Sequence, residues 1–74
     1  MNIVIVGMGE VGRYISSVLV SENHNVVIID SDQDALQQAE ETLDVMVLRG
    51  HGASMKTLTQ ANAAEADLFI AVTD

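Results

Sequence analysis

The sequence predicts an α/β fold in which a parallel β-sheet carries helices on both faces. Short apolar runs rich in Val and Ile alternate with helical segments along the 74-residue chain, the order expected of strand–helix–strand units. Hydrophobic residues make up 49% of the sequence but aromatic residues only 3%, so the core must be aliphatic, as in buried parallel sheets. A chain of this length forms at most one small domain.

The first strand and the first helix flank a glycine motif. Residues 3–6 are a continuous β-branched run, typical of a strand covered on both faces, and a helix is expected over residues 10–22. We expect this helix to pack on the sheet through the apolar side chains that recur on one of its faces: Val11, Ile15, Val18 and Leu19.

Three more strands and two more helices follow. The strands are expected at residues 25–30, 45–48 and 68–72. Asp32 should cap the second helix, and Ser54 a shorter third helix that ends at Asn62. The inward residues of these two helices are expected to be Leu36, Ala39 and Leu43 in the second and Met55, Leu58 and Ala61 in the third.

The four strands should lie in the order 3-2-1-4. Right-handed crossovers produce this order, which is the first part of the six-stranded dinucleotide-binding (Rossmann) fold. The fourth strand would then be an apolar edge, which proteins usually cover. We therefore expect residues 1–74 to form a single partial Rossmann domain that lacks the last strands, or a protomer that completes its sheet with another chain.

Charge and composition exclude several kinds of partner. The formal net charge of −8 repels nucleic-acid backbones and anionic lipid surfaces, so neither is expected as a direct partner. The chain has no Cys, and His24 and His51 are too few for a histidine-built metal site. No apolar run approaches the roughly 20 residues of a membrane span, so direct membrane insertion is not expected.

Gly7, Gly9 and Gly12 form a Gly-x-Gly-x-x-Gly motif between the first strand and the first helix. Gly7 permits a tight turn, Gly9 lets the backbone approach a pyrophosphate, and Gly12 lets the helix pack closely on the sheet. Amides at the helix N-terminus would then meet the phosphates. The alternative is that these glycines make a tight turn without a ligand.

Asp30 ends the second strand, 18 positions after Gly12. A carboxylate there accepts hydrogen bonds from an adenosine ribose and favours a free 2′-hydroxyl over a 2′-phosphate. No basic residue occurs between Arg13 and Arg49 to neutralise such a phosphate, and Glu10 would oppose a terminal phosphate if its side chain points inward. The sequence therefore favours NAD(H) over NADP, with ATP or ADP as further candidates. A solvated strand-end carboxylate is the alternative.

The sequence alone does not decide the roles of Arg13, Met8 and His51. Arg13 could reach a phosphate or be an ordinary exposed helix residue. Met8 could touch the ligand, and His51 could contact an adenine or be a loop histidine without a partner. No catalytic constellation and no metal-ligand spacing is present, so no catalytic residue is expected in this chain.

Four sequence blocks resemble the amino-terminal nucleotide-binding domain, the RCK or KTN domain, of TrkA-like potassium-uptake regulators. These blocks are residues 1–12, 30–32, 49–54 and 66–73. The resemblance covers the whole chain. The chain departs from the family pattern at His51, where the family most often has Asp, and at Asn62, where it usually has Gly.

The resemblance implies a cytoplasmic regulatory subunit that binds NAD(H), or ATP and ADP, and gates a membrane potassium transporter or channel. Such a subunit would lie at the inner face of the membrane through its partner and would assemble into dimers or rings. By this analogy the phosphates lie on the loop from Gly7 to Gly12, and the ribose on Asp30. The remaining implied contacts are Ser31, Gly50 and His51 around the adenosine and Val72 and Thr73 beside the far ribose.

Two other functions remain open at this point. The glycine motif and Asp30 equally suit the nucleotide-binding half of an NAD-dependent dehydrogenase, because a fold does not fix a function. Such an enzyme would take its catalytic groups from residues beyond Asp74. The weaker alternative is a structural fragment that binds nothing.

Overall fold

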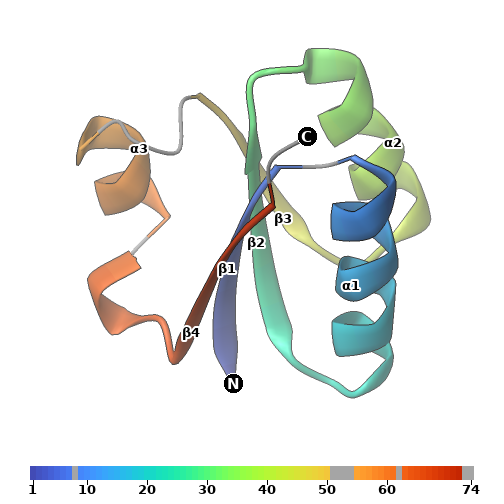
Figure 1. The fold of residues 1–74 in the computed structure, drawn as a ribbon, viewed down its shortest axis with the longest axis horizontal. Helices are drawn as coiled ribbons and strands as arrows, with labels where there is room; N and C mark the ends of the chain where they lie inside the picture. Colours follow the sequence, from blue (N-terminus) through green and yellow to red (C-terminus); the bar gives the residue numbers. More distant parts are fainter. Residues whose placement is uncertain (8, 51–54, 62, 73–74) are drawn as a thin grey trace.

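The computed structural model describes residues 1–7, 9–50, 55–61 and 63–72. Strands and helices alternate along these residues (Figure 1). The elements are β1 (Asn2–Val6), α1 (Glu10–Ser21), β2 (Asn25–Asp30), α2 (Gln33–Thr42), β3 (Met46–Arg49), α3 (Met55–Gln60), the 3-10 helix η1 (Ala63–Glu65) and β4 (Leu68–Ala71).

The four strands form one parallel sheet in the order β3-β2-β1-β4. Helices α1 and α2 cover one face of this sheet, and α3 lies on the other (Figure 1). The predicted α/β class, strand order and placement of helices are therefore confirmed, and the architecture is that of a truncated Rossmann-like fold. The strand bounds all agree with the prediction to within one residue, and β3 lies one residue later at both ends.

Two apolar cores lie on opposite faces of the sheet because successive strand side chains point in opposite directions. On the face of α1 and α2, Ile3, Ile5 and Ile28 are buried against Leu36 and Ala39 of α2. The core on the α3 face is smaller and contains Val4, Ile29 and Ala61 as buried residues. β1 and β2 contribute to both cores, as their continuous β-branched sequences predict.

The predicted packing face of α1 is half wrong. Ile15 and Leu19 pack against the core, but the side chains of Val11 and Val18 are 60% and 37% exposed. Gly12 and Ser16 are buried in their place. Gly12 lies against the backbone of the glycine loop, which turns the helix so that its small residues meet the sheet. The apolar spacing alone could not distinguish this orientation from the predicted one.

The second helix begins as predicted. The carboxylate of Asp32 accepts hydrogen bonds from the backbone N–H groups of Asp34, at 3.0 Å, and Ala35, at 3.4 Å. Leu36 and Ala39 are buried, and Leu43 is partly buried against the same core.

The predicted inward face of α3 is only partly described. Leu58 is partly buried against the smaller core, and Ala61 is buried. The side chain of Met55 is not among the described ones, and Ser54 and Asn62, the predicted ends of the helix, lie outside the described residues.

Candidate functional site

The carboxyl ends of β1 and β2 meet the N-termini of α1 and α2 at one edge of the sheet. All four strands are parallel, so their carboxyl ends share this edge, where Rossmann-like sheets bind ligands. β1 ends at Val6, the glycine loop follows, and α1 begins at Glu10. β2 ends at Asp30, three residues before α2 begins. The topology therefore brings together the two sequence features expected to bind a nucleotide.

Gly7 lies between the carboxyl end of β2 and the residue that follows β4. Its φ of +102° is rarely adopted by residues with a side chain, and a Cβ atom here would lie 2.0 Å from the carbonyl oxygen of Val72. The N–H of Gly7 donates to the carbonyl of Ile29 at 2.8 Å, and the N–H of Val72 donates to the carbonyl of Val6 at 2.8 Å. Position 7 therefore requires glycine for both conformation and space.

Gly12 and Gly9 have different structural roles. A Cβ atom on Gly12 would lie 2.5 Å from the carbonyl oxygen of Gly7, so glycine is needed for the close packing of α1 on the loop. Gly9 is the N-cap of α1, with φ −69° and ψ −173°, a conformation open to any residue. The backbone at position 9 thus does not itself require glycine, and no side chain caps the first-turn amides of α1.

Asp30 holds the loop between β2 and α2 from a half-buried position. Its Oδ1 accepts a hydrogen bond from the N–H of Asp32 at 2.8 Å. Its backbone carbonyl accepts one from the N–H of Gly50 at 3.0 Å, which ties the end of β2 to the residue that follows β3. The Asp30 carboxylate is therefore oriented by its own loop, at the same edge of the sheet as the N-terminus of α1.

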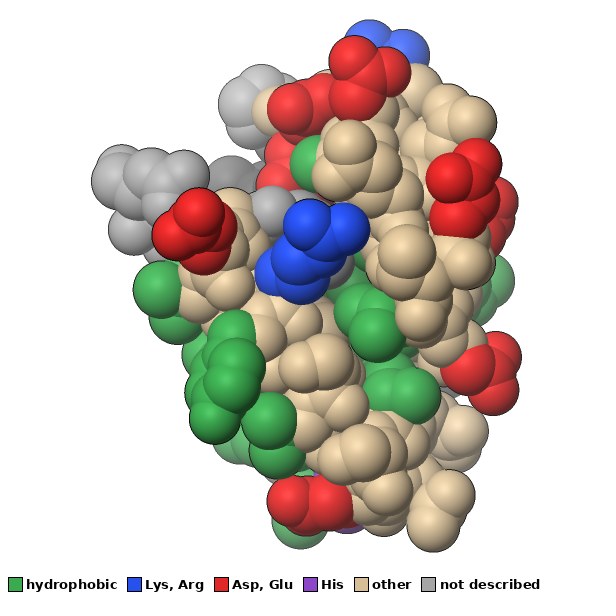
Figure 2. Space-filling view, turned by 90° about the vertical axis from the view of Figure 1, so that its right-hand side faces the viewer, with side chains coloured by type: hydrophobic (Ala, Val, Ile, Leu, Met, Phe, Trp, Pro, Cys, Tyr) green, Lys and Arg blue, Asp and Glu red, His purple; other side chains and the backbone are tan. Residues whose placement is uncertain are grey.

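A pocket of about 250 Å³ extends the site between α1 and α2. It is lined by Gly9, Glu10, Arg13, Ala35 and Gln38, so it contains one acidic and one basic side chain. The face formed by α1 and α2 carries many acidic side chains and few basic ones (Figure 2). Arg13 lies in the first turn of α1, close to the glycine loop, and its backbone N–H donates to the carbonyl of Gly9 at 2.9 Å.

The structure brings most of the sequence-predicted site residues to this edge. These are Gly7, Gly9, Glu10, Val11, Gly12, Asp30, Ser31, Gly50 and Val72. Val11 lies in the first turn of α1, and its side chain is largely exposed. Met8, His51 and Thr73, the other predicted contacts, lie outside the described residues.

Arg49 also lies at this edge of the sheet, although the sequence did not indicate it as a candidate site residue. It is the register partner of Asp30, although the two are 19 positions apart in the sequence. No basic residue occurs between Arg13 and Arg49 in the sequence, but the pairing of β2 with β3 brings Arg49 itself next to Asp30. Aligning the carboxyl ends of the predicted strands 25–30 and 45–48 pairs Asp30 with Leu48, so the observed partner, Arg49, follows only from the one-residue later position of β3.

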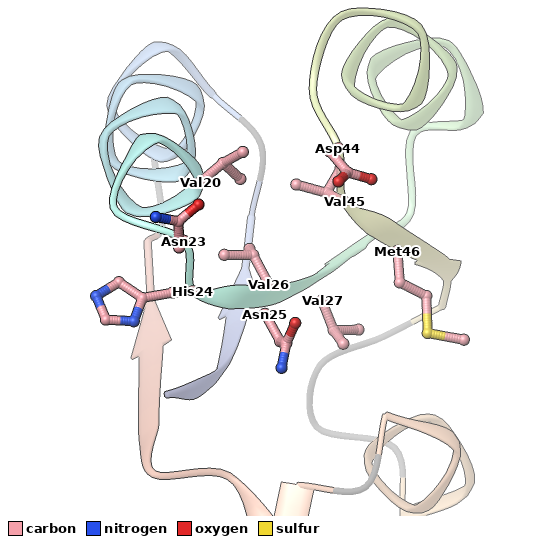
Figure 3. Close-up of a pocket in the computed structure, with 9 residues that line it drawn as sticks. All are labelled: Val20, Asn23, His24, Asn25, Val26, Val27, Asp44, Val45 and Met46. Atoms are coloured by element: carbon pink, nitrogen blue, oxygen red, sulfur yellow. The ribbon is translucent and has the colours of Figure 1, made fainter.

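A larger pocket, of about 590 Å³, lies at the opposite edge of the sheet, at the amino ends of β2 and β3 (Figure 3). Its lining includes His24, whose Nδ1 accepts from the N-terminal ammonium at 3.1 Å. None of the residues of the glycine motif lines it. Within the described residues no group of three or more His, Asp or Glu side chains could hold a metal ion, and no helix is long and apolar enough to cross a membrane.

Comparison with known proteins assigns the family. The family model of the TrkA-N domain matches residues 3–74, nearly the whole chain. The chain belongs to the TrkA-N domain family. This confirms the resemblance that the sequence blocks indicated, and a TrkA-N domain is a Rossmann-like nucleotide-binding domain.

Curated relatives of this TrkA-N domain carry names from potassium uptake. A Trk system potassium uptake protein TrkA homolog of Methanothermobacter thermautotrophicus is 38% identical over 99% of the chain, which spans 34% of that protein. The TrkA of Haemophilus influenzae is 41% identical and a TrkA homolog of Methanosarcina mazei 47%, again over 99% of the chain. The chain spans 16% and 17% of those two proteins.

Proposed function

We propose that this TrkA-N domain binds an adenine nucleotide, with NAD(H) preferred over ATP or ADP, and acts as the nucleotide-sensing module of a potassium uptake system. The phosphates would lie on the N-terminus of α1, and the adenosine ribose on Asp30. The observation that carries this proposal is the construction of the glycine loop. Gly7 and Gly12 are required by backbone contacts, whereas Gly9 is not required by its own backbone conformation and leaves the helix N-terminus without a side-chain cap.

The chemical groups at this edge of the sheet support binding of a nucleotide whose ribose has a free 2′-hydroxyl. The helix N-terminus favours phosphate through its unpaired amides and its dipole. Asp30, at the end of the neighbouring strand, supplies a carboxylate that can accept hydrogen bonds from ribose hydroxyl groups. The remaining proposed contacts, by analogy with the family, are Met8, Ser31, Gly50, His51, Val72 and Thr73.

A regulatory role is supported by the names of the relatives, which are potassium uptake proteins. In this proposal the domain is part of a cytoplasmic subunit that assembles as a dimer or ring and acts on a membrane potassium transporter or channel. A nucleotide that binds two conformations of such an assembly with different affinities would shift their populations and so bias the transporter. The chain itself would supply no catalytic group.

Isothermal titration calorimetry with NADH, NAD, ATP and ADP tests the site. Asp30→Asn keeps an oxygen that can accept from the N–H of Asp32 but removes the charge. It should weaken NADH binding about tenfold or more, because a hydrogen bond to a charged group contributes roughly 1.5–3 kcal/mol.

Asp67→Asn is the matched control for Asp30→Asn. The Asp67 carboxylate also accepts from a backbone N–H, that of Asn2 at 2.8 Å, but it lies at the amino end of β1. This variant should bind NADH like the wild type. If the wild type binds none of the four nucleotides at millimolar concentration, or if both variants weaken binding equally, the proposed site is wrong.

A further inference from the structure

We propose that Arg49 is a specificity-determining residue at the adenosine end of the site. By placing a positive charge beside Asp30, it lessens the discrimination against nucleotides that carry a 2′-phosphate. This inference rests on the proposed function, since it assumes that the ribose lies on Asp30. It concerns a residue of β3 that neither the glycine motif nor the acidic residue at the end of β2 indicates.

The pairing of β2 with β3 places Arg49 next to Asp30. The two residues are register partners at the ends of their strands, and the N–H of Gly50 donates to the carbonyl of Asp30 at 3.0 Å. Neighbouring strands lie about 4.8 Å apart in a sheet. β2 and β3 therefore stay adjacent up to Asp30 and Arg49, their last paired residues.

Both side chains project to the same face of the sheet. Ile28 and Val47 are also register partners, and both pack in the core beneath α1 and α2. Asp30 and Arg49 follow them by two positions, and residues two apart on a strand share a face. The Arg49 side chain therefore leaves the sheet beside the carboxylate that would bind the ribose.

Arg49 is the cation best placed to influence a group bound to Asp30. The chain has three basic residues, and the other two, Arg13 and Lys56, lie on α1 and α3. The Arg49 side chain is exposed and makes no ion pair within the part of the chain that the structure describes. Asp32 and Asp34, at the start of α2, add further negative charge near this edge.

Removing this positive charge should therefore change the affinities for NADH and NADPH by different amounts. A 2′-hydroxyl is neutral, whereas a 2′-phosphate carries about two negative charges, so the loss of Arg49 costs the phosphorylated nucleotide more. Exposed ion pairs contribute little each, so we expect an effect of about fivefold rather than a complete switch. The change in the ratio of dissociation constants should be smaller at high salt, because Arg49 and a bound 2′-phosphate would both be accessible to solvent.

The experiment measures dissociation constants of NADH and NADPH by calorimetry for the wild type, Arg49→Gln, Arg49→Lys and Arg13→Gln. Arg49→Gln should raise the ratio of the NADPH to the NADH constant about fivefold. Arg49→Lys keeps the charge and should leave the ratio within about twofold of wild type. Arg13→Gln is the matched control: it removes a charge close to the shared phosphates, so it should change both constants together and leave their ratio unchanged.

The outcomes separate this inference from the proposed function. If the wild type and Arg49→Gln both bind NADH but the ratio stays within about twofold, Arg49 does not set specificity and the inference is overturned while the site stands. The same holds if Arg13→Gln changes the ratio as much as Arg49→Gln does. Wild-type protein that binds neither nucleotide would overturn the proposed function and the inference with it.

Discussion

Gly7→Ala should lower the stability of the domain, whereas Gly9→Ala should weaken nucleotide binding with little effect on stability. At position 7 an alanine must keep a φ of +102°, and its Cβ would lie 2.0 Å from the carbonyl oxygen of Val72. A residue held in a sparsely populated backbone region costs about 1–3 kcal/mol, and overpacking adds about 1–3 kcal/mol. The free energy of unfolding should therefore fall by about 2–6 kcal/mol.

This loss is large for a domain of 74 residues. At roughly 0.05–0.15 kcal/mol per residue, such a domain has a free energy of unfolding of about 4–11 kcal/mol. One kcal/mol shifts the melting temperature of a domain this small by about 4–8 °C, so Gly7→Ala should lower it by at least about 8 °C. Circular dichroism during heating or urea unfolding measures the change.

Gly9→Ala is the control for that experiment. The φ of −69° at Gly9 suits alanine, and replacing glycine by alanine at an N-cap costs less than about 1 kcal/mol. Its melting temperature should stay close to that of the wild type, while NADH binding weakens about tenfold or more because the pyrophosphate must approach the backbone there. If Gly7→Ala melts within about 4 °C of the wild type, the account of the loop is refuted.

Further changes test the fold and the start of α2. Leu36→Ala removes a fully buried side chain and should lower the free energy of unfolding by about 2–5 kcal/mol in urea. Met46→Ala, at a position that is 58% exposed, should change it by less than about 0.5 kcal/mol. Asp32→Ala removes the cap of α2 and should cost about 1 kcal/mol, whereas Asp32→Asn keeps an acceptor and should cost less. Equal losses for the two Asp32 variants would contradict the capping role.

The sequence was sufficient to predict features that depend on neighbouring residues or on general rules of chain topology. Asp32 was predictable as a cap because an N-cap bonds amides two and three residues later. The strand order followed from the alternation of strands and helices and from right-handed crossovers. These rules do not depend on the details of packing.

Other features depended on contacts between distant parts of the chain. The orientation of α1 is set by the contact of Gly12 with Gly7, which spacing along the helix does not reveal, so Val11 and Val18 were assigned to the wrong face. The position of Arg49 beside Asp30 depends on the register of β2 and β3. In the candidate site, sequence could therefore identify the loop and the acidic residue but not the charge next to that residue.

The position of Gly7 beneath the carbonyl of Val72 has a consequence for how motion of the glycine loop could be observed. The loop cannot move toward β4 without displacing Val72, whose own amide is bonded to Val6 at 2.8 Å. Hydrogen exchange at the Val72 amide would therefore record the opening of the loop, even though this residue follows the last strand. Gly7 and the residue that follows β4 are thus in close contact, so a displacement of Gly7 would reach the edge strand of the sheet.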